Sequence, residues 1–246
     1  MIIGIVGSPR KGKLTDQLIT KCLEGAESAD DQITKVYLLD HHVRSFDGQI
    51  KCPEELNNLW KEANALVIGA PVYWGGINGL TKDFMDLAEI VDVNGKFGLG
   101  ISMAGGTGRG LCSALQNIYR FFYHRKMRAI EPTPVSRFNF EETLESIYDS
   151  GKRLAELSKE REPFKGDEDR MEYYESLDYL NYTFLDEMML LAKQLIKISE
   201  KNPEYTSAKD SFDTADSLIK EEKRKEAIEF AVNAYRLLYF DPPPKT

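Results

Sequence analysis

The chain has 246 residues, of which 42% are hydrophobic and 29% charged, a globular composition that excludes collagen-like, mucin-like and wholly disordered chains. Its formal net charge of −8 gives no long-range attraction to DNA or to an anionic membrane, so we expect neither nucleic acid nor membrane as a partner. No apolar run approaches the roughly 20 residues that a membrane-spanning helix needs.

Five short apolar runs rich in β-branched residues predict strands, at residues 1–6, 33–39, 65–70, 97–103 and 127–135. Between and after them, apolar residues at helical spacing predict helices at residues 15–25, 54–63, 80–90, 111–123 and 141–157. Because the strands are apolar on both faces, we expect a five-stranded parallel sheet between two helical layers, a three-layer α/β sandwich. Right-handed crossovers favour the flavodoxin-like strand order 2-1-3-4-5.

The composition changes after about residue 160, which divides the chain into an α/β domain at residues 1–160 and an α-helical extension at residues 161–246. Steps of three and four residues predict one apolar helix stripe, formed by Leu177, Leu180, Phe184, Met188, Leu191, Leu195 and Ile198. Further helices are expected at residues 204–221 and 224–239, before the proline-rich end at residues 241–244. The stripe needs a partner surface, and packing on its own neighbours or on another protein chain both remain open.

The first candidate ligand loop follows the first strand and combines two hydroxyls with three cations: Ser8, Arg10, Lys11, Lys13 and Thr15. Beside a helix start, such a loop suits a phosphate. The spacing of Gly7, Gly12 and Lys13 matches a Walker A loop, but Leu14 replaces its magnesium-binding hydroxyl residue, and Pro71 ends the third strand where a Walker B strand supplies Asp. Both replacements disfavour a nucleotide triphosphatase.

Two more loops follow the third and fourth strands. The first suits a planar ligand, because it sets two aromatic side chains beside two glycines, and it consists of Pro71, Val72, Tyr73, Trp74, Gly75 and Gly76. The second lets the backbone lie against a ring edge and adds one cation, and it consists of Ala104, Gly105, Gly106, Thr107, Gly108, Arg109 and Gly110. The carboxyl ends of parallel strands share one sheet edge, so all three loops are expected to converge on one ligand.

These loops resemble those of the NADPH-dependent FMN reductases and the related iron–sulfur flavoproteins. The first loop matches the family motif at residues 7–10 and at Thr15, whereas Lys13-Leu14 stands where the family has Gly-Asn. The segment after the third strand matches a longer motif at Ala70, Pro71, Tyr73, Trp74, Gly75, Gly79, Lys82, Phe84 and Asp86. The resemblance covers about residues 1–160. It implies an FMN phosphate on the first loop, the flavin ring between the other two, and NADPH or NADH as co-substrate.

The resemblance also implies a function, an FMN-binding oxidoreductase that passes electrons from NAD(P)H to a flavin, quinone, metal ion or redox protein. The flavin performs the hydride transfer, so no catalytic acid or base is expected, and Arg109 has at most an electrostatic role. The alternatives are an FMN-dependent electron carrier or regulatory protein without NAD(P)H turnover, and a nucleotide-binding protein without flavin. We expect a homodimer or homotetramer, and we expect the helical extension to form an oligomer interface or to cover part of the flavin site.

The cysteines do not predict a metal centre. Cys22, Cys52 and Cys112 form no Cys-x-x-Cys pair, and Cys52 stands alone where the iron–sulfur branch of the resembling family carries a compact cysteine cluster. We therefore expect no iron–sulfur cluster and no other metal site. The cysteine usage, together with an apolar start at residues 1–6 that is too short for a signal-peptide core, predicts a reducing, cytoplasmic location.

Three weaker catalytic patterns remain. Ser102 lies in a sequence that loosely resembles a nucleophile elbow, but no Asp or Glu lies between it and the only later histidine, His124, which disfavours a hydrolase. Cys112 lies near a predicted helix start, where a reactive thiolate is an alternative to simple packing. His41 and His42 follow the second strand and are expected to be solvated, with a substrate contact as the alternative.

Overall fold

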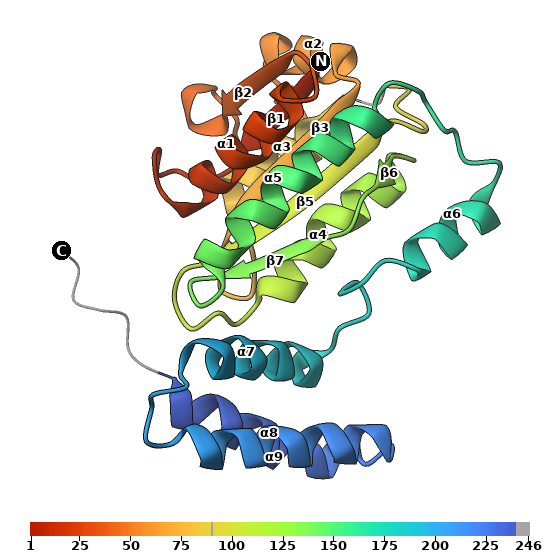
Figure 1. Ribbon diagram of the computed structural model, residues 1–246. Helices are drawn as coiled ribbons and strands as arrows, with labels where there is room; N and C mark the ends of the chain where they lie inside the picture. Colours follow the sequence, from red (N-terminus) through yellow and green to blue (C-terminus); the bar gives the residue numbers. More distant parts are fainter. Residues whose placement is uncertain (90, 240–246) are drawn as a thin grey trace.

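A twisted parallel sheet runs through the first half of the chain, with helices on both faces (Figure 1). The computed structural model describes residues 1–89 and 91–239, so Ile90 and the proline-rich end at residues 241–244 lie outside the described residues. The sheet has the order β2-β1-β3-β5-β6. These strands are β1 (Ile2–Val6), β2 (Ile33–Tyr37), β3 (Ala65–Tyr73), β5 (Phe97–Ala104) and β6 (Arg128–Ala129).

The predicted three-layer fold is confirmed, with two differences in the strands. The expected fifth strand is split into β6 and β7 (Thr133–Ser136), and both pair in parallel with β5. Pro132 precedes β7 and cannot donate to a ladder, which explains the interruption. In addition, β4 (Gly76–Ile77) pairs antiparallel with the end of β3, so β3 extends to Tyr73 instead of ending at Ala70 as expected.

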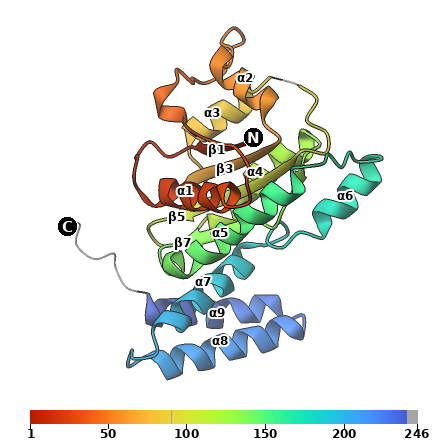
Figure 2. The same cartoon turned by 45° about the horizontal axis from the view of Figure 1, so that its top comes forward.

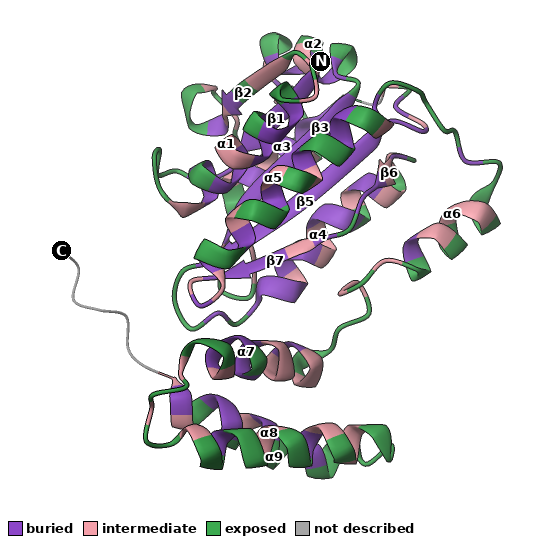
Figure 3. Ribbon diagram, in the orientation of Figure 1, coloured by how far each residue is buried: buried purple, intermediate pink, exposed green. Residues whose placement is uncertain are grey.

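Alternating side chains of the strands fill two separate cores. In β1, Ile3 and Ile5 belong to one core cluster, whereas Ile2 and Val6 belong to the other. The first cluster lies under α2 (Glu54–Glu62), α3 (Gly79–Leu87) and α4 (Leu111–His124), and the second under α1 (Leu14–Glu27) and α5 (Phe140–Leu157). Burial on both faces explains why β1, β3 and β5 are apolar along nearly their whole length, whereas the edge strand β2 is mostly only half-buried (Figure 3). A short 3-10 helix, η1 (Leu38–Asp40), shortens the second strand by two residues relative to the prediction.

A helix that the sequence patterns do not predict, α6 (Asp167–Glu175), lies beside the β6 edge of the sheet (Figure 1). Its Tyr173 hydroxyl donates to the carbonyl oxygen of Ala129 at 2.7 Å, and Tyr174 donates to that of Met127 at 2.7 Å. These bonds satisfy carbonyl groups at the edge of the sheet, so α6 protects this edge from pairing with another chain.

The last three helices pack below the carboxyl ends of the strands, with α7 (Phe184–Ile198) between the sheet and the pair α8 (Tyr205–Lys220) and α9 (Arg224–Leu238) (Figures 1 and 2). The predicted single stripe is wrong at its start, because a capping box of Thr183 and Asp186 begins α7 only at Phe184. Leu177 and Leu180 therefore lie in the connection after α6.

The buried part of the stripe packs within the same chain. Leu191 and Leu195 share a core cluster with Cys112 of α4 and with Tyr235 of α9. None of the helices in the described part of the chain combines the length and the apolar composition that a bilayer-spanning helix requires.

Candidate functional site

A cavity of about 550 Å³ lies between the loops after β3 and β5 and the start of α7. Its volume falls in the range of small-molecule sites. Of the residues predicted for the two loops, ten line this cavity: Val72, Trp74, Gly75, Ala104, Gly105, Gly106, Thr107, Gly108, Arg109 and Gly110. Pro71 and Tyr73 of β3 and Gly76 of β4 do not line it.

The upper wall of the cavity is a tight hairpin between β3 and β4. Tyr73 pairs with Gly76, which leaves Trp74 and Gly75 as a two-residue turn with φ values of +53° and +81°. Positive φ at both positions is typical of a type I′ turn, which suits glycine or asparagine far better than tryptophan. Trp74 nevertheless occupies the first position, and its side chain is fully exposed. A strained, exposed indole beside a cavity points to contact with a ligand.

The opposite wall is the glycine-rich loop after β5. A Cβ atom added at Gly105 or Gly106 would meet no atom within 4 Å, so the backbone there borders open space. A Cβ at Gly110, in contrast, would lie 2.3 Å from the Cα of Gly75, so the two loops touch at this point. We call the part of the cavity between these two loops the slot; backbone on one side and an indole nearby are surroundings that suit a flat ring.

The loop between β1 and α1 lies at the same edge of the sheet but does not line the cavity. Lys11 donates to Asp40 at 2.6 Å, whereas Arg10 and Lys13 are exposed. Lys13 is the N-cap residue of α1 and makes no side-chain capping bond. The first backbone N–H groups of a helix have no intrahelical partner, so this end of α1 suits an anion such as a phosphate.

The other two residues predicted for this loop are buried. Ser8 accepts a hydrogen bond from the Arg10 backbone N–H at 3.2 Å, which shapes the turn. The methyl group of Thr15 faces Gly69 in β3, where an added Cβ would come within 3.2 Å of it. Ser8 and Thr15 thus help to set the shape of the loop, and Arg10 and Lys13 supply its accessible positive charge.

An acidic residue that sequence reasoning missed, Asp16, binds the backbone of the same loop. The buried carboxylate of Asp16 accepts hydrogen bonds from the Gly12 backbone N–H at 2.6 Å, from Lys35 at 3.0 Å and from Tyr37 at 3.2 Å. Burial alone raises the pKa of Asp16, but these bonds outweigh burial, and the net pKa is lowered. The sequence offers one signal for this role: Asp16 lies in the first turn of a helix, where an acidic residue is favoured.

We expect Asp16→Asn to lower the free energy of unfolding by about 1–2 kcal/mol at neutral pH, because it weakens a buried charge-assisted bond. Because the pKa of Asp16 is lowered in the folded protein, the carboxylate stabilises the fold at pH values above its ordinary pKa of 3.8. This stabilisation is lost as the pH falls below 3.8. Urea denaturation across that range is the measurement, and the difference between variant and wild type should shrink in acid. Asp40→Asn, which removes an exposed ion pair with Lys11, is the matched control. A pH-independent difference for Asp16→Asn would contradict this role.

Several residues of the longer sequence motif hold the fold together. Phe84 is buried in the core, and Lys82 and Asp86 form an ion pair one helical turn apart on α3. Asn78, which the sequence analysis did not single out, donates to the carbonyl oxygen of Gly7 at 2.8 Å and accepts from Thr81 at 2.7 Å. These bonds connect the start of the first loop with the start of α3.

The cavity also has walls that sequence reasoning missed: Ser113, Phe184, Glu187 and Met188. Three of them belong to α7, so the helical extension closes part of the site. The sequence analysis named such a cover as one of two alternatives, but it named none of these α7 residues as site residues, because they lie far along the chain from the predicted loops.

The weaker catalytic patterns do not reach the cavity. Ser102 is buried and donates to the carbonyl oxygen of Leu111 at 2.8 Å. Burial raises the pKa of the Cys112 thiol, which makes a reactive thiolate unfavourable. His41 lies 3.5 Å from Glu55 of α2. Among the described residues, no three His, Cys, Asp or Glu side chains gather in a way that could hold a metal ion.

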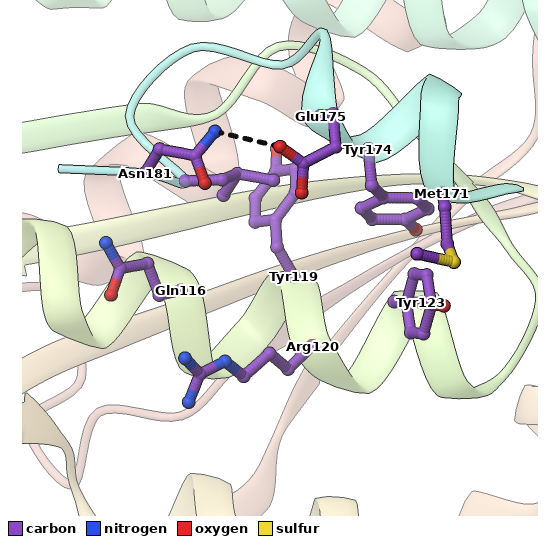
Figure 4. Close-up of a pocket in the computed structure, with 9 residues that line it drawn as sticks. Gln116, Tyr119, Arg120, Tyr123, Met171, Tyr174, Glu175 and Asn181 are labelled. Carbon is purple, nitrogen blue, oxygen red and sulfur yellow. Dashed lines mark hydrogen bonds between the residues drawn. The ribbon is translucent and has the colours of Figure 1, made fainter.

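A second cavity, of about 270 Å³, lies between α4 and α6 (Figure 4). Tyr119, Tyr123 and Tyr174 form its floor, and Arg120 and Glu175 contribute charge. None of the residues predicted for ligand binding lines it. The larger cavity is therefore the candidate site.

Known proteins with similar sequences are flavoproteins. An iron-sulfur flavoprotein of Methanocaldococcus jannaschii is 26% identical over 187 residues, which cover 64% of this chain and 97% of that protein. An iron-sulfur flavoprotein of Archaeoglobus fulgidus is 27% identical over 183 residues, which cover 67% of this chain and 90% of that protein.

Solved structures show the same fold. A flavodoxin from the domain Archaea aligns with a TM-score of 0.51 at 20% identity, over 65% of this chain and all of that one. The apo form of an NADH:FMN oxidoreductase aligns with a TM-score of 0.50 at 21% identity, over 70% of this chain and 89% of that one. The alignments establish a flavodoxin-like fold.

The family model described as NADPH-dependent FMN reductase matches residues 1–137, which hold the first strand and helix, the two cavity loops and α4. The match covers more than half of the chain. The protein therefore belongs to the NADPH-dependent FMN reductase family.

Proposed function

We propose that the protein binds FMN and uses it to pass electrons from NADPH or NADH to an acceptor. The observation that carries the proposal is the slot between the strained Trp74 turn and the open glycine backbone at Gly105 and Gly106, in a member of this family. When bound, FMN supplies the hydride and electron transfer itself. The protein's task is to hold the ring, exclude water from it and place the co-substrate.

In this proposal the two ends of the site have different tasks. Arg10, Lys13 and the first N–H groups of α1 bind the phosphate, while Lys11 is held by Asp40. Trp74 and the backbone of residues 104–109 flank the ring. Arg109 lines the cavity with its guanidinium 5.2 Å from the ring centre of Tyr235, where its charge can stabilise a reduced ligand.

We further propose that the protein carries no iron–sulfur cluster, unlike the relatives named for one. Cys22, Cys52 and Cys112 are buried in three different core clusters, so they cannot ligate one cluster together. The acceptor, a small molecule or a redox protein, and a homodimeric or homotetrameric assembly are further parts of the proposal. Light scattering of the purified protein tests the assembly.

The phosphate site is tested by comparing FMN with riboflavin, which lacks the phosphate. We expect Arg10→Ala combined with Lys13→Ala to weaken FMN binding by about tenfold or more, since each phosphate contact from a cation contributes on the order of 1 kcal/mol. Riboflavin binding should stay unchanged. Quenching of flavin fluorescence gives both affinities. Lys159→Ala removes an exposed cation just beyond the end of α5 and serves as the control.

Reduction of the bound flavin by NADH or NADPH in the absence of oxygen tests the reaction. Bleaching of the flavin colour at a rate that depends on the nucleotide concentration supports an oxidoreductase. FMN binding without any reduction by either nucleotide would instead identify an electron carrier or regulatory protein. A protein that takes up neither FMN nor riboflavin would overturn the proposal as a whole.

A further inference from the structure

The helical extension places one carboxylate at the candidate ring site. Glu187 of α7 lines the cavity and is only 6% exposed. One of its oxygens accepts a hydrogen bond from the Gly110 backbone N–H at 2.6 Å, and the other accepts from the Cys112 backbone N–H at 2.9 Å. Both carboxylate oxygens are therefore bound to the first turn of α4.

This contact replaces a local helix cap. The N-cap residue of α4 is Gly110, which has no side chain, and its φ of +89° favours glycine at this position. Without Glu187, the free N–H groups and the positive end of the α4 dipole would face the cavity, an arrangement that attracts anions. The carboxylate satisfies those groups and cancels their charge.

The rest of the glycine-rich loop is also held by the extension. The Tyr235 hydroxyl of α9 donates to the carbonyl oxygen of Thr107 at 2.8 Å. A Cβ at Gly108 would lie 2.5 Å from a methyl group of Leu191, so α7 packs directly on the loop. The loop thus takes its shape from α7 and α9 as well as from the sheet.

We propose that Glu187 is a positioning residue of the flavin site. Its carboxylate orders the first turn of α4, and its negative charge disfavours the negative charge that reduction places on the flavin ring. The inference rests on the proposed FMN function. Its consequence is that bound FMN is a stronger reductant than it would be beside an uncapped α4. The extension would then tune the reaction as well as cover the site.

The test compares Glu187→Gln with a matched control from the same helix. Gln194 is 7% exposed, accepts a hydrogen bond from the Ser136 hydroxyl at 2.6 Å and does not line the cavity. Gln194→Ala thus removes a buried contact of α7 without altering the charge at the site. The measurement is the ratio of the affinities for reduced and oxidised FMN, obtained from the midpoint potential of the full-length protein.

We expect Glu187→Gln to raise this ratio about tenfold in favour of reduced FMN, because it removes a buried charge near the ring. Gln194→Ala should leave the ratio unchanged even where it lowers the melting temperature. An unchanged ratio in Glu187→Gln would overturn the inference. Glu187→Asp keeps the charge, so it should keep the ratio of wild type, and a rise equal to that in Glu187→Gln would overturn the role of the charge. Should Glu187→Gln fail to fold, Glu187→Asp tests the ordering role, because its shorter side chain should let the Gly110 and Cys112 amides exchange faster than in wild type.

A second readout separates this inference from the proposed function. In the flavin-free protein, amide hydrogen exchange at Gly110 and Cys112 should be faster in Glu187→Gln than in wild type or in Gln194→Ala. Equal exchange would overturn the ordering role of Glu187 whether or not the protein binds FMN. A wild-type protein that orders these amides but binds no flavin would overturn the proposed function together with the tuning role.

Discussion

Replacing Gly110 with alanine is expected to damage the fold and the flavin site together. The added Cβ would lie 2.3 Å from the Cα of Gly75, a distance that requires the backbone of one loop to move. The φ of +89° at Gly110 adds strain for any residue with a side chain. We expect a loss of about 2–4 kcal/mol in the free energy of unfolding. FMN affinity should fall by about 100-fold, because the two loops that flank the ring would be forced apart. This loss corresponds to roughly 3 kcal/mol of binding free energy.

The control for Gly110→Ala is Gly105→Ala in the same loop. No atom lies within 4 Å of a Cβ at Gly105, so the fold should lose less than about 1 kcal/mol. The methyl group would instead enter the slot and weaken FMN binding. Denaturant unfolding of the flavin-free proteins and FMN titration measure the two effects separately. A Gly110→Ala protein with the FMN affinity of wild type would show that the contact with Gly75 is not part of the ring site.

The sheet could be predicted because its signal is local. Each strand is a short apolar run, the first and third end directly at Gly7 and Pro71, and the alternation with helices allows few topologies. The hairpin at Trp74 was harder to foresee, since tryptophan is a poor residue for a turn with positive φ. Helix α6 was missed because its sequence is strongly acidic and has no apolar face that sets it apart from a loop.

The sequence predicted only those parts of the candidate site that have a local sequence signal, namely its loops. The three loops after β1, β3 and β5 could be read from their glycines and cations. Their partners could not: Lys11 is neutralised by Asp40, Gly12 is bound by Asp16, and the first turn of α4 is capped by Glu187. The Glu187 contact joins residues 77 positions apart, so only the folded chain shows it. The centre of the apolar stripe of α7 needs no second protein chain, because Leu191 and Leu195 are buried in a core cluster of this chain.

Replacing Trp74 with glycine is expected to change stability and binding in opposite directions. The φ of +53° costs a bulky residue about 1 kcal/mol, which glycine avoids, although glycine loses more entropy on folding. The flavin-free variant should therefore be as stable as wild type or up to about 1 kcal/mol more stable. FMN binding should weaken by at least about tenfold, because stacking of a ring on an aromatic side chain contributes roughly 1–3 kcal/mol.

Trp74→Phe separates the two effects, since it keeps an aromatic ring and the strained backbone. It should bind FMN within a few fold of wild type and gain no stability. Urea unfolding of the flavin-free proteins and fluorescence titration with FMN are the measurements. Undiminished FMN affinity in Trp74→Gly would remove Trp74 from the ring site, whereas lower stability would show that the turn is not strained. A gain in stability together with a loss of binding would mean that the chain keeps a costly residue in this turn because the ligand needs it.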